Sequence, residues 1–239
     1  MSETNPTPGV DNRERQIAVI LLFIIPVLFS TNIITARAVN DFIPPFALAF
    51  WRWWLAFLLF LPLIAPDLIR YRREILGEWR DLLVLGILGM GICGAFVYIG
   101  ADTTSATNIG LIYATAPIII AGAATLLYRE PLGRAKATGI LISLCGVLVI
   151  VFRGDIHALR TLSLVPGDLW IMTSAIAWAV YSVMLRYRPS RLPGRVRFAA
   201  TMLYGAIALL PFHIVELTNG EIPQLNPETI GAVLIVAIV

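Results

Sequence analysis

The sequence predicts an all-α fold, specifically a polytopic bundle of transmembrane helices. Hydrophobic residues make up 58% of the chain and charged residues only 14%, whereas soluble domains carry about 25% charged residues. The mean hydropathy is +0.82. The apolar residues gather into runs of roughly 20, the length that crosses a bilayer core about 30 Å thick. Because backbone groups cannot stay unpaired in lipid, these runs must be helices.

Seven apolar runs follow a polar segment, residues 1–15, which is expected to form a disordered cytoplasmic tail. The runs lie at about residues 16–36, 46–65, 81–101, 106–127, 135–152, 167–185 and 197–216. An eighth run begins at Glu228 and is still apolar at Val239, which predicts a helix that is cut midway. The first run also imitates a cleavable signal peptide. The internal repeat described below uses that run as a helix, which argues against cleavage.

The basic residues predict the orientation. Most of the 18 fall on the tail and on the second, fourth and sixth loops: Arg13, Arg15, Arg70, Arg72, Arg73, Arg80, Arg129, Arg134, Lys136, Arg186, Arg188, Arg191, Arg195 and Arg197. Since basic loops stay in the cytoplasm, we expect a multi-pass protein of a bacterial inner membrane with a cytoplasmic N-terminus. The net charge of +3 does not indicate a nucleic-acid partner, because the charges lie in short clusters between apolar runs.

The chain resembles itself weakly when it is shifted by 149 residues. Phe29 then falls on Trp178, Arg37 on Arg186 and Pro62 on Pro211. The unit contains five helices, so a first repeat over residues 16–152 is followed by an inverted one over 167–239. Ten helices are expected, of which about seven and a half are present. Inverted repeats are typical of transporters that work by alternating access.

Several short motifs in the first half occur in a specific order. They are Pro44-Pro45-Phe46 with Arg52 and Ala56, Tyr98-Ile99-Gly100-Ala101, Ser105 to Ile112, Ala116-Pro117, Tyr128-Arg129-Glu130-Pro131-Leu132, and Gly139 with Gly146-Val147. In this order they resemble the drug/metabolite transporter superfamily, EamA type. The resemblance implies ten helices in two repeats and export of small metabolites. Tyr128-Arg129 departs from the family, which often has Leu-Gly there.

Arg52 is the strongest candidate for contact with substrate. It lies inside the second run, roughly 9 Å from its start at 1.5 Å per residue. A charge inside the membrane is by default a hypothesis of function. The alternative is that its long side chain extends to the outer interface. If Arg52 faces a cavity, it would bind a substrate carboxylate or a helix C-terminal carbonyl.

Other candidates are weaker. Polar or amphipathic residues that could line a central cavity are Asn32, Tyr98, Tyr113, Trp178 and Tyr181, some of which could instead serve helix packing. Trp178 and Tyr181 share a helix face, and Asn32 aligns with Tyr181 in the repeat.

Two motif residues and several small residues are interpreted as structural. We expect Glu130 to pair with Arg129 or Arg134. Pro117 should kink its helix, as should Pro26, Pro62 and Pro211. Small residues at fourfold spacing, such as Gly139 and Gly86, should allow close helix packing.

The sequence favours a secondary transporter of small molecules over two alternatives. A membrane enzyme would need converging catalytic groups, and no paired carboxylates or nucleophile–base spacing appears. A receptor-like or structural bundle would not explain the repeat. No cofactor and no metal site is expected. The sequence contains no nucleotide-binding loop, so we do not expect this chain to be a self-contained ATP-driven pump. Expected partners are a small-molecule substrate and the lipid bilayer. A homodimer is compatible with the sequence, and the substrate is left open among amino acids, sugars, nucleotide precursors and cationic drugs.

Overall fold

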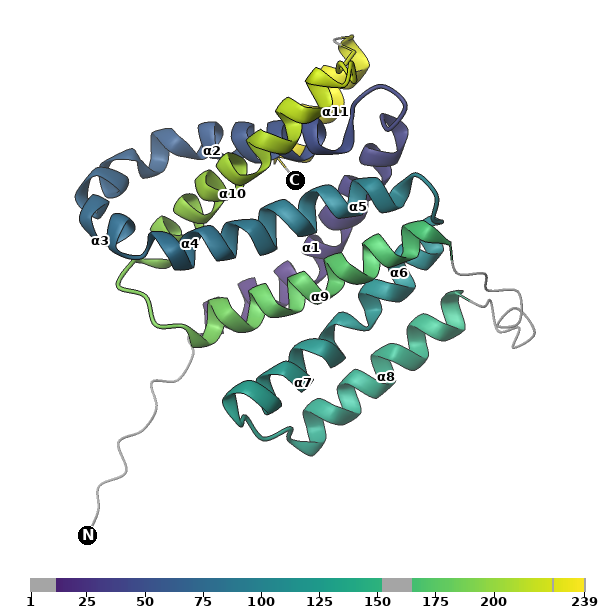
Figure 1. Ribbon diagram of the computed structural model, residues 1–239. Helices are drawn as coiled ribbons and strands as arrows, with labels where there is room; N and C mark the ends of the chain where they lie inside the picture. The colour runs from purple at the N-terminus through teal and green to yellow at the C-terminus, as the bar shows by residue number, and fades with distance from the viewer. Residues whose placement is uncertain (1–11, 152–164, 225, 239) are drawn as a thin grey trace.

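The computed structural model describes residues 12–151, 165–224 and 226–238, and every regular element in these ranges is a helix (Figure 1). In chain order the elements are α1 (Asn12–Ala38), α2 (Pro45–Arg70), α3 (Arg72–Gly77), α4 (Trp79–Gly86), the π-helical segment η1 (Ile87–Ile92), α5 (Cys93–Ala101), α6 (Ala106–Ala114), α7 (Ala116–Tyr128), α8 (Arg134–Val151), α9 (Pro166–Tyr187), α10 (Gly194–Thr218) and α11 (Pro227–Ile238). The predicted all-α polytopic bundle is confirmed.

Within the described ranges, six helical stretches are long and apolar enough to cross a membrane. They are Val19–Ala38, Pro45–Arg70, Trp79–Ala101, Ala106–Tyr128, Pro166–Tyr187 and Gly194–Thr218. The third joins α4, η1 and α5, and the fourth joins α6 and α7. The predicted run 135–152 forms α8, an 18-residue helix that is not among the six. The run at Glu228 forms α11, whose 12 residues are too short to cross.

Two of these spans are not a single regular α-helix: Trp79–Ala101 contains the π-helical segment η1, and Ala106–Tyr128 breaks at Thr115. Pro117 is the second residue of the helix that follows this break. Proline has no N–H to donate to the preceding turn and its ring clashes there, so the break lies where the sequence predicts a kink. Pro26, Pro62 and Pro211 lie inside helices that continue through them. The π-helical segment η1 has no counterpart among the sequence-based expectations.

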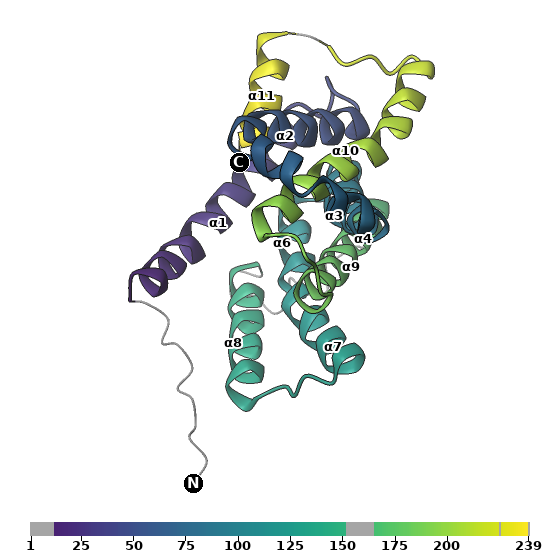
Figure 2. The same ribbon diagram turned by 90° about the vertical axis from the view of Figure 1, so that its left-hand side faces the viewer.

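The centre of the bundle is formed by α2, α4–α5, α9 and α10, which lie side by side in Figures 1 and 2. Glycine permits a close approach of α4 and α10. A Cβ atom on Gly86 would lie 2.6 Å from the backbone nitrogen of Gly205, so neither helix could keep its position. The predicted role of Gly86 in close packing is therefore confirmed. The same expectation is wrong for Gly139, because a Cβ there would meet nothing within 4 Å among the described residues.

Helices α2 and α10 run antiparallel and are tied together at both ends. At one end the carboxylate of Glu216, in the last turn of α10, accepts hydrogen bonds from the backbone N–H groups of Phe46 (2.8 Å) and Ala47 (2.7 Å). At the other end Asp67, in the last turn of α2, forms a salt bridge of 2.8 Å with Arg195. Each helix thus binds the first turn of the other through a carboxylate.

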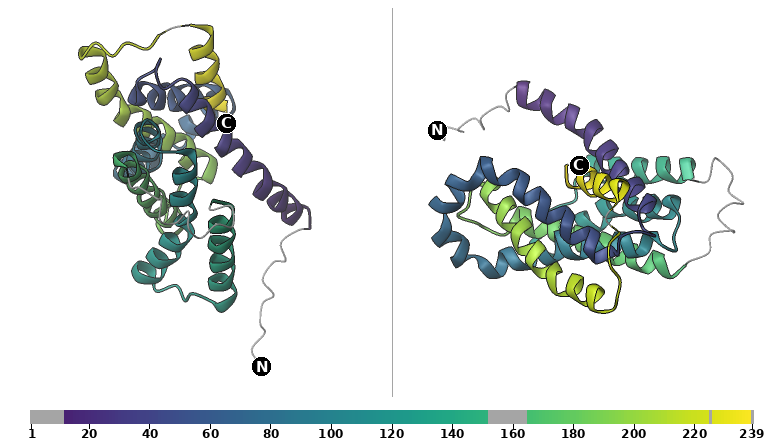
Figure 3. Two further views of the ribbon diagram at one scale, coloured as in Figure 1. Left: turned by 90° about the vertical axis from the view of Figure 1, so that its right-hand side faces the viewer. Right: turned by 90° about the horizontal axis from the view of Figure 1, so that it is seen from above.

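The first helix extends away from the centre, as Figure 3 shows. Large apolar side chains from Val19 to Leu28 are exposed, whereas Asn32, Ala36 and Val39 are buried against the bundle. An apolar surface of this kind is what lipid tolerates. Only the last turns of α1 therefore contribute side chains to the interior. Helix α8 packs against α6 at the edge of the bundle (Figure 1).

Candidate functional site

Three residues that the sequence singles out meet inside the bundle. Arg52 of α2 donates from Nη1 to the hydroxyl of Tyr98 on α5 at 3.2 Å and to Oδ1 of Asn32 on α1 at 3.5 Å. The Tyr98 hydroxyl in turn donates to the same Oδ1 at 3.4 Å. Asn32 is only 3% exposed. We call these three residues the Arg52 cluster.

Local sequence explains how α2 presents Arg52. Pro44 and Pro45 begin the helix, because proline has the backbone φ of a helix start and needs no N–H there. Arg52 follows about two turns later, roughly 10 Å along the axis. The ring of Trp53 packs against the guanidinium, with 4.6 Å from Cζ to the ring centroid. A cation–π contact of this kind holds the charged group in one plane.

The Arg52 cluster has more donors than acceptors. Among the described residues, Arg52 forms no salt bridge. Asn32 Nδ2 and Trp53 Nε1 are buried and have no hydrogen-bond partner there. Buried polar groups are normally satisfied, and an unsatisfied one costs about 1–3 kcal/mol. The cluster is therefore incomplete as it stands and calls for an acceptor.

Tyr113 of α6 belongs to a second polar contact. Its hydroxyl lies 2.7 Å from the Ser174 hydroxyl on α9, and its ring packs edge-on against Phe29 of α1. Ser174 also bonds with Cys93, whose Sγ donates to the Ser174 carbonyl at 3.1 Å. Cys93 begins α5 immediately after the π-helical segment. This contact links α5, α6 and α9 at the end of α5 opposite Tyr98.

Trp178 and Tyr181 stack on each other with 5.5 Å between ring centroids, as their shared helix face predicts. Their surroundings differ. Tyr181 is 5% exposed and lies against Gly89 of η1, where a Cβ would be 2.8 Å from the ring, whereas Trp178 is 41% exposed. Among the described residues, no hydrogen bond joins either one to the Arg52 cluster. Their contact with substrate stays a prediction.

Glu130 has different partners from those expected. Its Oε1 lies 3.5 Å from Lys136 Nζ and 3.5 Å from Arg186 Nη2, rather than against Arg129 or Arg134. Arg129 adopts a left-handed conformation, φ 54°, which ends α7 and turns the chain toward α8. The contact to Arg186 connects the α7–α8 turn with the end of α9. Glu130 thus has the structural contacts that its position in the turn suggests.

Sequence reasoning missed two buried carboxylates. Asp168 is 1% exposed and accepts hydrogen bonds from the Thr104 hydroxyl, from Asn108 Nδ2 (3.2 Å) and from the Val165 N–H (2.9 Å). Its place three residues into a helix start is a capping signal that could have identified it. Glu216 could have been found through the repeat, because it falls on Asp67 when the chain is shifted by 149 residues.

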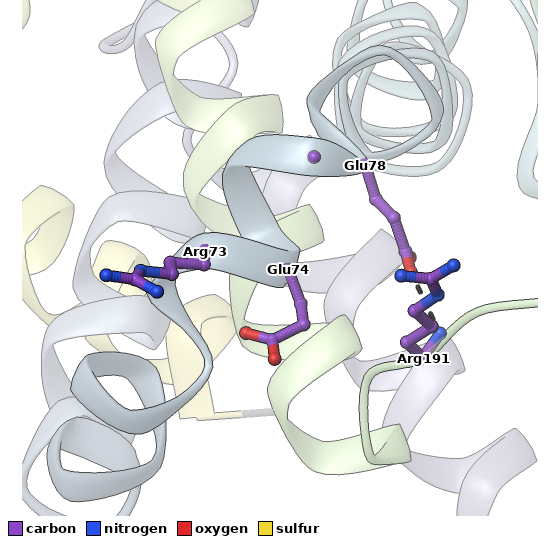
Figure 4. A pocket seen from close by; sticks show the side chains of 5 residues that line it. Arg73, Glu74, Glu78 and Arg191 are labelled. Atoms are coloured by element: carbon purple, nitrogen blue, oxygen red, sulfur yellow. Dashed lines mark hydrogen bonds between the residues drawn. The ribbon is translucent and has the colours of Figure 1, made fainter.

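Three cavities lie away from the Arg52 cluster. The largest, about 480 Å³, is a surface pocket lined by Arg73, Glu74, Gly77, Glu78 and Arg191 (Figure 4). Its charges are mixed in sign, and Glu78 is used to hold the chain before α10 through Ser190 (2.6 Å) and the Arg191 N–H (2.8 Å). The other two, of about 430 and 330 Å³, are lined mostly by apolar side chains. None of the three combines an uncompensated charge with unsatisfied donors.

The Arg52 cluster is suited to binding rather than to bond chemistry. It offers a cation, an amide donor and a tyrosine hydroxyl. Arg and Trp are poor general bases, and no carboxylate or histidine takes part in the cluster. In the part of the chain that the structure describes, no group of three metal-ligating side chains occurs.

Comparison with known proteins agrees with this interpretation. The sequence profile of the EamA-like transporter family matches residues 16–152 and 165–239. The chain is 28% identical over 197 residues to the uncharacterized transporter YyaM of Bacillus subtilis, covering 82% of this chain and 63% of that protein. It is 28% identical over 201 residues to an uncharacterized transporter of Archaeoglobus fulgidus, covering 81% and 65%.

A third relative is the uncharacterized transporter YdfC of B. subtilis, 33% identical over 165 residues, which cover 67% of this chain and 52% of that protein. The chain thus spans less than two thirds of the length of each of these relatives. No solved structure gives a significant match. Because the profile matches most of the chain and the described helices can span a membrane, this protein is a multi-pass membrane protein that belongs to the EamA-like transporter family.

Proposed function

We propose that this protein is a secondary transporter of a bacterial inner membrane that exports small metabolites or drugs by alternating access. The observation that carries the proposal is the Arg52 cluster, a charged group with unsatisfied donor neighbours among membrane-spanning helices. Keeping a charge inside the membrane costs at least about 2.5 kcal/mol, which a purely structural bundle has no reason to spend. Asn32, Tyr98 and Arg52 would contact the solute, with Tyr113, Trp178 and Tyr181 farther along its path.

Alternating access rests on the inverted repeat. The reciprocal contacts of α2 and α10 support it, because a shift of 149 residues carries Asp67 onto Glu216 and Phe46 onto Arg195. Two halves that are related in this way can exchange conformations, which opens a shared site first to one side and then to the other.

A cytoplasmic N-terminus follows from the arginine distribution. Two salt bridges support it, between Arg195 and Asp67 and between Arg188 and Asp81, since they join basic loops that should share one side of the membrane. The inner side would then carry Arg72 and Arg191, and the outer side Asn219.

The energy source is proposed to be the gradient of the solute itself or a proton gradient. No Asp or Glu lies in the middle of a described membrane-spanning helix, since Asp168 and Glu216 stand in the first and last turns of theirs. Facilitated, gradient-driven movement therefore needs no further group, whereas proton coupling would need a carboxylate or histidine that relays the proton. His213 is the one histidine within the described residues, and it stacks on Phe50 near the end of α10.

Transport by reconstituted protein tests the proposal. The protein, expressed from its gene, is purified and placed in liposomes loaded with a bacterial metabolite extract, and released solutes are identified by mass spectrometry. We expect a small set of solutes to leave faster than from empty liposomes, and Arg52→Lys to reduce that release because a point charge replaces a bidentate fork. Release equal to that from empty liposomes for every solute would contradict transport and favour the structural alternative.

A further inference from the structure

We propose that the Arg52 cluster binds the carboxylate group of the transported solute, so that the substrates of this protein are organic acids or amino acids with a free carboxylate. The inference rests on the proposed transport function and narrows its substrate class. It selects among the amino acids, sugars, nucleotide precursors and cationic drugs that the sequence leaves open.

The first step is the charge of Arg52. Two carboxylates among the described residues are buried, and both are engaged away from Arg52. Asp168 is bound by Thr104, Asn108 and the Val165 N–H. Glu216 is bound by the first turn of α2. With both carboxylates occupied, the guanidinium is the excess charge of the cluster, and an anion is the ligand that compensates it.

The second step is the set of unused donors. Asn32 Oδ1 already accepts from Arg52 and from Tyr98, so the amide presents Nδ2, which has no partner among the described residues. Trp53 Nε1 is also buried without a partner there, but it lies against Gly94 of α5, so the unused donor of the cluster is Asn32 Nδ2. This amide group donates and does not accept. A ligand that satisfies both Nδ2 and the guanidinium must bring acceptors only, and an ionised carboxylate is such a group.

The third step is geometry. The Trp53 ring covers one face of the guanidinium, and both hydrogen bonds of Arg52 to the cluster use Nη1. The rest of the planar fork is therefore held in a fixed plane, as bidentate binding of a planar carboxylate requires. A cationic solute would instead be repelled at this point, in a medium where charges are poorly screened.

Substitution of Asn32 by aspartate separates a substrate role from a structural one. Asn32→Asp changes the cluster by little in size and gives Arg52 a permanent carboxylate partner. If Arg52 were only structural, the new ion pair would be tolerated and transport would continue. If Arg52 binds the substrate carboxylate, Asn32→Asp should leave the folded yield unchanged and raise the KM for release on the order of tenfold to a hundredfold.

The experiment repeats the liposome release assay with wild type, Asn32→Asp, Arg52→Gln and Arg52→Lys. Two matched controls are Asn219→Asp, which adds the same charge at an exposed site, and Arg80→Gln, which removes an arginine that likewise packs on a tryptophan, with 5.4 Å from Cζ to the ring of Trp79. Folded yield is measured by size-exclusion chromatography. We expect the released solutes to carry a carboxylate, the KM for their release to rise in Asn32→Asp as stated above, their release to be lost in Arg52→Gln, and both controls to match wild type.

An anionic lipid headgroup is the other source of an anion, and a second arm distinguishes it. Wild type and Arg52→Gln are placed in nanodiscs of phosphatidylcholine alone or with phosphatidylglycerol. If lipid occupies the cluster, phosphatidylglycerol raises the melting temperature of wild type but not of Arg52→Gln, which overturns the inference. Release of solutes without a carboxylate, unaffected by Asn32→Asp, also overturns it while leaving transport intact. Absence of any release contradicts the proposed function itself.

Discussion

Asp67 and Glu216 stand 149 residues apart, and each binds the first turn of the helix to which the other belongs. The first carboxylate pairs with Arg195 at the start of α10, and the second accepts from Phe46 and Ala47 at the start of α2. The same shift of 149 residues aligns Phe46 with Arg195. The salt bridge and the carboxylate–backbone contact therefore lie at positions that the shift of 149 residues exchanges. This agreement supports the predicted inverted repeat.

Removing the carboxylate of Glu216 should loosen this helix pair. Glu216→Leu leaves the buried N–H of Ala47 without an acceptor, at a cost of about 1–3 kcal/mol, and also removes the acceptor of the part-buried Phe46 N–H. We expect Glu216→Leu to melt at a lower temperature than wild type in detergent. Melting is measured as the loss of the folded peak in size-exclusion chromatography after heating. Glu221→Gln, which changes an exposed carboxylate nearby, is the control and should melt as wild type does. Equal melting of Glu216→Leu and wild type would show that this contact does not hold α2 to α10.

The contact between Gly86 and Gly205 makes a second prediction about packing. In Gly205→Ala the new methyl group would overlap Met90 and the backbone of Gly86, so α4 and α10 must move apart. Overpacking of this kind costs about 1–3 kcal/mol. Gly139→Ala has open space and should be neutral or slightly stabilising, because alanine favours helix. Thermal stability of the two variants checks this, and a Gly205→Ala protein as stable as Gly139→Ala would refute the close approach.

Orientation can be read by labelling. Single cysteines at Asn219 and at Arg72, in a background without Cys93 and Cys145, are treated with a membrane-impermeant maleimide in intact cells and in inverted vesicles. We expect position 219 to react only in cells and position 72 only in inverted vesicles, since basic loops stay in the cytoplasm. The opposite pattern would reverse the topology.

One acidic residue beyond a membrane span gives a prediction about pH. Partial burial raises the pKa of the Asp102 carboxyl above its ordinary value, and the negative charge of Asp41 raises it further. The folded state therefore binds this proton more tightly than the unfolded chain, so the ionised carboxylate reduces stability once the pH exceeds both pKa values. Asp102→Asn should melt at a higher temperature than wild type at pH 7.5, with a smaller difference at pH 4.5. A difference that is the same at both pH values would contradict this assignment.

The sequence predicts those features of the fold that depend on the lipid solvent and on the covalent geometry of single residues. Apolar runs of membrane-spanning length predict the helices, and Pro117 marks the break between α6 and α7, because these effects are local. Arg52, Asn32 and Tyr98 could be named individually because polar side chains are conspicuous in apolar runs. Their meeting on α1, α2 and α5 depends on tertiary packing, which residue types do not specify.

The contacts that the sequence does not predict depend on how distant helices pack together. Gly139 has the same spacing signal as Gly86, yet within the described residues only Gly86 has a helix placed against it. The partners of Glu130 come from Lys136 and from Arg186, 56 residues away, because the turn after α7 brings α9 close. The contacts of Asp168 with Thr104 and Asn108 join residues that are 64 and 60 positions away in the chain, so they depend on how α9 packs.

Two-sided access to the Arg52 cluster tests the account most directly. A cysteine at Asn32, in a background without Cys93 and Cys145, is treated with a small charged thiol reagent, added to intact cells or to inverted vesicles. Alternating access predicts modification from both sides, slowed in both by a solute that the protein releases. Modification from one side only, or from neither, would contradict a pathway through this cluster.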